Sequence, residues 1–111
     1  MSIRTNTQVI LSSRPVGFPE QNNFDVVTVP MPEPKEGQIL VEILWLSLDP
    51  YMRGRMKDVK SYAAPTKIGE VMLGGTVGRV LWSRTPRFSS GEIVEGALGW
   101  QSHAVSDGIG I

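Results

Sequence analysis

The segment Leu46–Met56, Leu-Ser-Leu-Asp-Pro-Tyr-Met-Arg-Gly-Arg-Met, places a phenol and a flexible thioether directly after an apolar stretch. Asp49 can accept backbone N–H bonds at a helix start, and Pro50 is tolerated at the first helical position because its missing N–H has no partner there. A strand that turns abruptly into a short helix leaves Tyr51 and Met52 at the edge of the scaffold. The pattern predicts that both side chains are available to a cleft.

The elements that position these side chains are predicted to be short strands. Ile39–Leu48 is apolar on both alternating faces apart from Glu42 and Ser47, which predicts a central strand covered on both sides. The proline-rich stretch 30–34 indicates a rigid connector, and the polar stretch Lys57–Thr66 indicates a surface excursion. Three glycines at positions 74, 75 and 78 are expected to let a strand bend or another backbone approach closely. Five further strands are predicted: Gln8–Leu11, Phe24–Val29, Thr76–Trp82, Glu92–Glu95 and Trp100–Val105.

Composition sets limits on the class of protein. A chain of 111 residues with 41% hydrophobic and 20% charged residues has the length and composition of a single globular domain. The formal net charge of zero gives no electrostatic reason to expect a nucleic acid or an anionic membrane as a partner. The absence of cysteine excludes disulfides and thiolate metal sites, and the opening residues lack the apolar segment of a signal peptide. We therefore expect a cytoplasmic protein with no membrane span.

The sequence contains several motifs that could indicate other chemistry, but each lacks a residue or element that this chemistry requires. Gly74–Gly78 resembles a phosphate-binding loop, but Leu73 occupies the position of the first glycine, and a strand follows where that motif needs a helix. A catalytic zinc needs several ligands, and His103 is the only histidine. His103 itself is expected to be a surface or rim imidazole, and no nucleophile-elbow pattern supports a Ser-His-Asp site. Arg53 and Arg55 are expected on a solvated face rather than in a phosphate site.

Three blocks carry a resemblance to a known family: Asp-Pro-Tyr-Met-Arg-Gly-Arg-Met at 49–56, Gly-Glu-Val-Met-Leu-Gly-Gly-Thr-Val-Gly-Arg-Val at 69–80, and Gly-Trp-Gln-Ser-His-Ala-Val-Ser-Asp-Gly at 99–108. Together they resemble the amino-terminal lobe of the zinc-independent medium-chain reductases, the branch of prostaglandin, alkenal double-bond and curcumin reductases. The resemblance runs from about Gln8 to Ile111. It implies a mainly β fold, a GroES-like distorted antiparallel barrel with one or two short helices. It also implies that residues 1–111 are one N-terminal domain, and that a Rossmann domain with most of the NADPH contacts is absent from this sequence.

The resemblance sharpens the role expected for Tyr51. Hydride addition to an enone places negative charge on its carbonyl oxygen, and a phenol, with a pKa of about 10, can donate a hydrogen bond to that oxygen without carrying charge. Tyr51 is therefore the candidate enolate stabiliser, although packing of the helix against the barrel is the alternative. Four further candidates for lining the substrate cleft are Met52, Ala97, Leu98 and Trp100, and ordinary core packing remains open for Met52 and Trp100.

The sequence thus predicts the substrate-side lobe of an NADPH-dependent, zinc-free reductase of alkenals, enones or quinones. We expect this lobe to be inactive alone and to bind no cofactor tightly. We assign none of its residues to cofactor binding or to metal binding. Apolar surface that normally contacts the missing domain is expected to promote self-association. The alternative is a non-enzymatic β-barrel module that binds a small apolar ligand or a protein partner.

Overall fold

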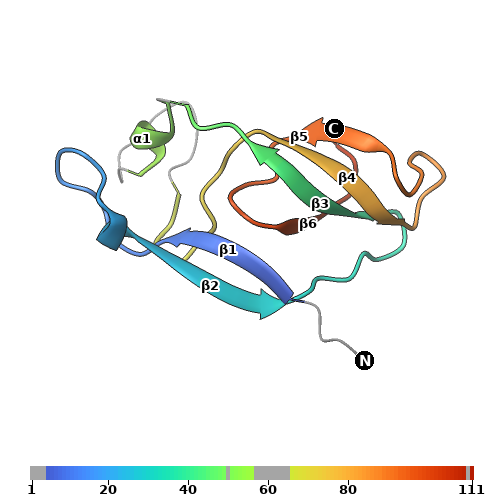
Figure 1. The fold of residues 1–111 in the computed structure, drawn as a ribbon, viewed down its shortest axis with the longest axis horizontal. Helices are drawn as coiled ribbons and strands as arrows, with labels where there is room; N and C mark the ends of the chain where they lie inside the picture. The colour runs from blue at the N-terminus through green and yellow to red at the C-terminus, as the bar shows by residue number, and fades with distance from the viewer. Residues whose placement is uncertain (1–4, 50, 57–65, 110) are drawn as a thin grey trace.

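The computed structural model describes residues 5–49, 51–56, 66–109 and 111, with Tyr51 and Gly54 described by their backbone alone. These residues form short strands and two short helices (Figure 1). The elements are β1 (Thr5–Leu11), the 3-10 helix η1 (Gln21–Asn23), β2 (Phe24–Pro30), β3 (Ile39–Leu46), α1 (Tyr51–Arg55), β4 (Thr76–Ser83), β5 (Ile93–Gly96) and β6 (His103–Ser106). The mainly β fold expected from the sequence is confirmed.

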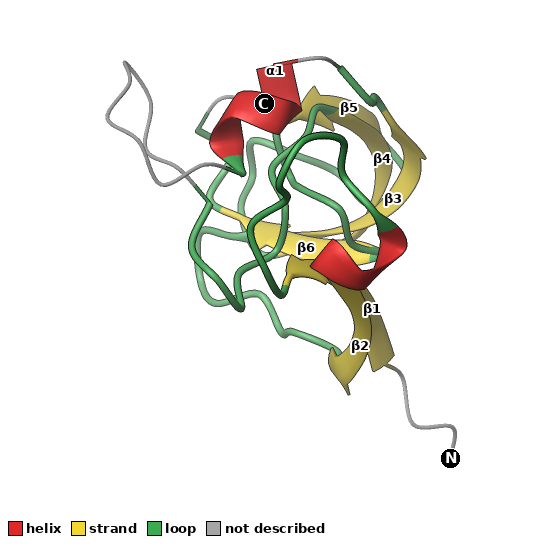
Figure 2. Ribbon diagram, turned by 90° about the vertical axis from the view of Figure 1, so that its left-hand side faces the viewer, coloured by secondary structure: helices red, strands yellow, loops and turns green. Residues whose placement is uncertain are grey.

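All strand pairs are antiparallel, and they form two sheets. The first sheet is the β1–β2 pair, and the second has the order β5-β4-β3-β6. From the side, β3, β4 and β5 form one curved wall, with the β1–β2 pair below them (Figure 2). Helix α1 and the loop that joins β1 to η1 lie at the same end of the molecule (Figure 1).

Strand β3 is central, as predicted, but its burial differs from the prediction. Its first three residues are buried, whereas Leu44, Trp45 and Leu46 are exposed. The reason is that β6 pairs with residues Ile39–Glu42 alone, so the second half of β3 extends beyond that neighbour. The expectation that 39–48 is covered on both sides is therefore wrong for the second half, and the strand ends at Leu46.

The last predicted strand, Trp100–Val105, divides between two neighbours. Ser102 N donates to Thr7 O at 2.8 Å, and Ser102 O accepts from Ile43 N at 2.8 Å. Residues 100–102 therefore lie against β1, while the residues after them pair with β3 as β6. The regular strand begins three residues later than predicted because the chain changes neighbour at Ser102.

A buried amide ties β1 to this segment. Asn6 is 1% exposed, and its Oδ1 accepts from Ser102 Oγ at 3.0 Å and from His103 N at 2.8 Å. Its Nδ2 donates to Gln101 Oε1 at 2.9 Å, and Gln8 Nε2 donates to the same oxygen at 3.0 Å. Because the buried amide is paired on both its oxygen and its nitrogen, it joins the two sheets without an unpaired polar group.

The apolar core consists of two clusters. One lies within the four-stranded sheet, and the other lies between β1, the end of α1 and the segment before β4. The first contains Ile39, Val41, Val80 and Val94, and the second contains Leu11, Met56 and Met72. The second cluster packs against the site described below, since Phe24 and Trp100 are its partly buried neighbours.

At two of the three glycines 74, 75 and 78, neighbouring atoms lie so close that a side chain would not fit. A Cβ added at Gly78 would meet Val41 Cγ1 and would lie 2.6 Å from Glu42 O, where the β3–β4 register shifts. A Cβ added at Gly74 would lie 2.8 Å from Leu46 Cδ1. Gly75 has nothing within 4 Å of the same position, so close approach does not account for a glycine there.

Candidate functional site: two cavities that meet at Asp49

Two arginines hold the loop after β1 against α1. Arg14 Nη1 donates to the carbonyl oxygens of Met56 and Thr66, each at 2.9 Å. Arg53 donates from Nη2 to Pro15 O at 3.1 Å, and from Nε and Nη2 to Gly17 O at 3.1 and 2.9 Å. Every one of these acceptors is a backbone carbonyl. The contacts between the loop and the helix therefore do not depend on which side chains the accepting residues carry.

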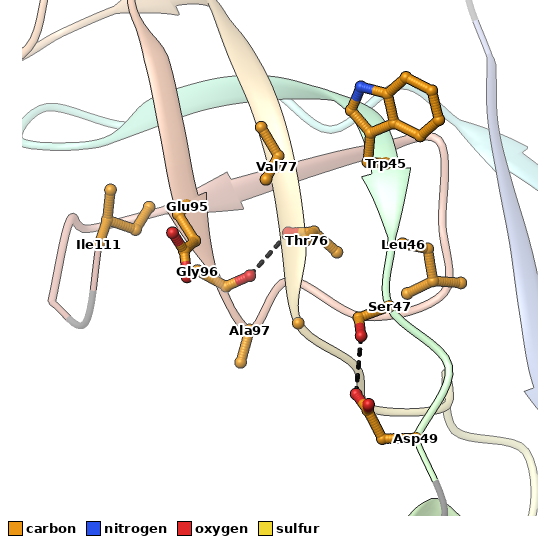
Figure 3. Close-up of a pocket in the computed structure, with 11 residues that line it drawn as sticks. Trp45, Leu46, Ser47, Asp49, Thr76, Val77, Glu95, Gly96, Ala97 and Ile111 are labelled. Atoms are coloured by element: carbon orange, nitrogen blue, oxygen red, sulfur yellow. Dashed lines mark hydrogen bonds between the residues drawn. The ribbon is translucent and has the colours of Figure 1, made fainter.

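The first cavity, which we call cavity 1, opens between the ends of β3, β4 and β5 (Figure 3). Its volume is about 710 Å³, within the range of roughly 300–1,000 Å³ typical of small-molecule sites. Exposed apolar side chains of β3 form one side, and Ile111, the last residue of the sequence, lines another. The lining residues are Trp45, Leu46, Ser47, Asp49, Gly75, Thr76, Val77, Glu95, Gly96, Ala97 and Ile111.

Two hydrogen bonds join polar groups that line cavity 1. Thr76 Oγ1 donates to Gly96 O at 2.7 Å, which uses its only proton and fixes the start of β4 to the end of β5. Ser47 Oγ donates to Asp49 Oδ2 at 2.8 Å (Figure 3). Each hydroxyl oxygen retains acceptor capacity, and the exposed carboxylates of Asp49 and Glu95 make the rim acidic.

Asp49 differs in detail from the helix cap that the sequence predicts. Its side chain accepts from Ser47 Oγ, and its backbone oxygen accepts from Met52 N at 3.1 Å. Its own N–H points to Met52 Sδ at 3.5 Å. These contacts place Asp49 directly before α1 and connect it to Met52 through the backbone and the thioether.

The second cavity, cavity 2, shares Asp49 with cavity 1. Its volume is about 400 Å³, and most of its lining is apolar. Phe24 and Trp100 stack within it, with ring centroids 5.6 Å apart and an interplanar angle of 26°. The full lining is Pro19, Phe24, Leu48, Asp49, Met52, Arg53, Met56 and Trp100.

Gly74 lies where side chains of the two cavities converge. Its ideal Cβ position is 2.8 Å from Leu46 Cδ1, which belongs to cavity 1. The same position is 3.0 Å from Trp100 Nε1 and 3.1 Å from Met52 Cε, which belong to cavity 2. The three side chains therefore fill the space that a side chain at residue 74 would need.

The structure places the predicted site residues in three different environments. Ala97 is exposed and lines cavity 1, whereas Met52 and Trp100 line cavity 2. Leu98 lines neither cavity and packs against the core cluster of the four-stranded sheet. Tyr51 begins α1, two residues after the acid that both cavities share, and its side chain lies outside the description.

Sequence reasoning missed most of the lining. Trp45 and Leu46 were assigned to a covered strand, because an uninterrupted apolar run does not distinguish core from cavity wall. Arg53 was expected on a solvated face, yet it is half-buried and lines cavity 2. Phe24 comes from a strand far away in the chain, and no local pattern marks it as a neighbour of Trp100.

His103 lies at intermediate exposure in β6, and its Nδ1 is 2.9 Å from Ser102 Oγ. Within the described ranges, no three His, Asp or Glu side chains gather as a metal site would require. None of the helices in these ranges has the length and apolarity needed to cross a membrane.

Comparison with known proteins adds a family and several relatives. Residues 7–111 match the family described as the N-terminal domain of oxidoreductase. The chain is 48% identical over 103 residues to NADPH-dependent curcumin reductase of Escherichia coli K12, covering 93% of this chain and 30% of that protein. It is 42% identical over 95 residues to prostaglandin reductase 1 of Rattus norvegicus, covering 86% of this chain and 27% of that protein.

A crystal structure shows the same fold. CurA from Vibrio vulnificus superposes with a TM-score of 0.93 at 51% identity, over 96% of this chain and 31% of CurA. CurA has also been solved in complex with NADPH, and that structure matches with a TM-score of 0.89. The chain thus spans about a third of the length of the relatives it matches.

Proposed function

The chain belongs to the family of oxidoreductase N-terminal domains, and from this membership we propose that it is the substrate-side lobe of an NADPH-dependent reductase. Its substrates are small apolar alkenals, enones or quinones, and the reaction saturates an activated carbon–carbon double bond or reduces a quinone. The relatives named for NADPH-dependent curcumin reduction and for prostaglandin reduction support this class.

We further propose that residues 1–111 are a single GroES-like domain and that the cofactor is held mainly by a Rossmann domain outside this sequence. Support comes from the segment Gly74–Gly78, which leads into strand β4 rather than the helix that a pyrophosphate site needs. These glycines do not fit the phosphates of NADPH, so we assign no cofactor ligand in this lobe. NADPH supplies the hydride in the complete enzyme, and the residues of this lobe bind and polarise the substrate.

The observation that carries the proposal is the position of Tyr51. Its backbone begins α1 two residues after Asp49, which lines both cavity 1 and cavity 2. In this proposal the Tyr51 phenol donates a hydrogen bond to the substrate carbonyl oxygen as negative charge develops on it. Protonation of the carbon then completes the reduction, with solvent or a side chain as the source of the proton.

The same arrangement divides the proposed substrate contacts. Ala97 and the apolar residues of β3 contact the reacting end in cavity 1, while Met52 and Trp100 contact an apolar portion in cavity 2. Leu98, the next residue of the same loop, acts indirectly by anchoring that loop to the core cluster of the four-stranded sheet. The lobe uses no zinc in this scheme, since hydrogen bonding from a phenol stabilises the oxygen.

A fusion protein tests the proposal. Residues 1–111 replace the corresponding lobe of CurA from Vibrio vulnificus, and NADPH absorbance is followed with cinnamaldehyde as substrate. We expect substrate-dependent NADPH oxidation, and none from the CurA remainder without a lobe. A fusion that folds and binds NADPH but leaves cinnamaldehyde unreduced would contradict the proposal, and saturable cinnamaldehyde binding in that fusion would favour a binding module instead.

In the same fusion, Tyr51→Phe keeps the ring and removes the donor. Loss of one oxyanion donor is expected to lower kcat on the order of 100-fold, with a smaller change in KM. Trp82→Phe is the matched control, because Trp82 is 48% exposed and lines neither cavity. Equal kcat values for the two variants would remove Tyr51 from the mechanism.

A further inference from the structure

Two carboxylates stand at the rim of cavity 1 without a cationic side chain to balance them. Asp49 lies on the chain after β3, and Glu95 lies on β5 (Figure 3). Both side chains are exposed. The described residues that line the cavity include no lysine, arginine or histidine. A molecule that enters cavity 1 therefore meets a net negative charge.

The two hydroxyl groups of cavity 1 add to this negative character. Ser47 Oγ donates its proton to Asp49 Oδ2, and Thr76 Oγ1 donates its proton to Gly96 O. Thr76 is 3% exposed, so water does not compete for its bond. Because each hydroxyl has a single proton, both oxygens present only lone pairs to a ligand. The polar groups at the ends of β3 and β4 thus offer acceptors and no further donor.

Of the two carboxylates, Glu95 is the one without a partner. Asp49 accepts a hydrogen bond from Ser47, whereas the Glu95 side chain has no hydrogen bond or ion pair with any described residue. Glu95 is directly opposite Val77 in the β4–β5 pair, and both residues line the cavity. The charge of Glu95 is therefore not neutralised by the described part of the chain, and it acts on what enters cavity 1.

We propose that Glu95 is a specificity-determining residue through which cavity 1 disfavours anionic substrates and admits neutral or cationic ones. Glu95 and Asp49 repel an anionic group, and the described lining offers no arginine or lysine to pair with it. The inference rests on the proposed function, which places the reacting end of the substrate in cavity 1. Among unsaturated carbonyl compounds, the lobe therefore selects neutral ones over those that carry a carboxylate beside the reacting double bond.

The charge of cavity 1 can be measured without any reaction. Trp45 is 73% exposed and lines the cavity, and its indole N–H signal is followed by NMR in the 111-residue chain, with Trp45→Phe for assignment. Two nitroxides of similar size, cationic 4-amino-TEMPO and anionic 4-carboxy-TEMPO, are compared by the relaxation that each causes. At neutral pH and low salt, we expect the cation to relax the Trp45 signal on the order of threefold more than the anion, and the difference to shrink as salt is added.

Two charge-neutralising variants locate the source of this preference. Glu95→Gln is expected to lower the cation-to-anion ratio at Trp45 on the order of twofold, and to leave the ratio at Trp82, which lines neither cavity, unchanged. Glu33→Gln is the matched control, because Glu33 is equally exposed and lines neither cavity. A ratio of one at Trp45 in the unmodified chain, or equal ratios in the two variants, would overturn the proposal.

The consequence for the substrate is measured in the CurA fusion. The anion trans-4-oxo-2-butenoate carries a carboxylate on the double bond, and its methyl ester is the neutral analogue. We expect Glu95→Gln to raise kcat/KM for the anion relative to the ester on the order of threefold, mainly through KM, and Glu33→Gln to leave this ratio unchanged. The comparison between variants cancels the difference in reactivity between the two compounds.

The outcomes separate this proposal from the reductase proposal. If the fusion reduces the ester but Glu95→Gln leaves the anion-to-ester ratio unchanged, the charge selection is rejected and the reductase stands. If the fusion oxidises no NADPH while the charge preference at Trp45 depends on Glu95, the charge selection of cavity 1 stands and the reductase is rejected.

Discussion

At the scale of single residues, the absence of a side chain at Gly74 leaves room for three side chains that line the two cavities. We predict that Gly74→Ala destabilises the chain by about 1–3 kcal/mol, because the new methyl group overlaps the space of Leu46 Cδ1, Trp100 Nε1 and Met52 Cε. Leu46 and Met52 can yield at their flexible ends, whereas the Trp100 ring is stacked on Phe24 and cannot yield as easily. Urea unfolding followed by circular dichroism measures the change.

The neighbouring glycine is the matched control for this substitution. Gly75 has nothing within 4 Å of its Cβ position, and its φ is not positive. Gly75→Ala is therefore expected to change the free energy of unfolding by less than about 0.5 kcal/mol. If the two alanine variants unfold at the same urea concentration, the convergence of side chains on Gly74 is not a packing constraint.

At the scale of elements, the contact between β1 and the segment before β6 depends on Asn6. We predict that Asn6→Ala costs about 2–3 kcal/mol, because it leaves His103 N and Gln101 Oε1 with fewer partners in a buried environment. Gln8→Ala removes one bond to the same Gln101 oxygen from a half-buried side chain, and we expect it to cost less than about 1 kcal/mol. Comparable losses in thermal unfolding would show that Asn6 has no special role.

The elements also show what the sequence can and cannot predict. The positions of most strands and the helix after Asp49 follow from local patterns, because periodicity, turn residues and proline act over a few positions. The neighbour change at Ser102 and the exposure of Trp45 depend on where distant strands end, and no short window contains that information. For the same reason, no local pattern indicates that Ala97 lines cavity 1, that Met52 and Trp100 line cavity 2, or that Leu98 packs against the core.

At the scale of the whole molecule, apolar side chains remain exposed around the two cavities. Trp45 is 73% exposed and Leu48 is 69% exposed, and Leu46 between them is 36% exposed. Contiguous apolar surface of this kind is typical of a region that a partner covers. We predict that the chain self-associates through this surface as its concentration rises, as measured by sedimentation velocity.

A single substitution tests the location of that contact. Trp45→Ser is expected to shift the sedimentation profile toward the monomer, because it removes the largest exposed apolar side chain beside cavity 1. Trp82→Ser removes an exposed tryptophan that lines neither cavity and is expected to leave the profile unchanged. A strictly monomeric profile of the unmodified chain at high concentration would contradict the prediction.

The amide of Asn6 has a consequence for how the chain is made. Its partners lie at sequence separations of 95 to 97 residues, so β1 leaves the ribosome well before the segment that completes its hydrogen bonds. The β1–β2 hairpin can form early, but the other edge of β1 is paired only when residues 69–72 and then residues 100–102 have been made. Because contacts between distant residues slow folding, the edge of β1 stays open during synthesis to pairing with strands of other chains.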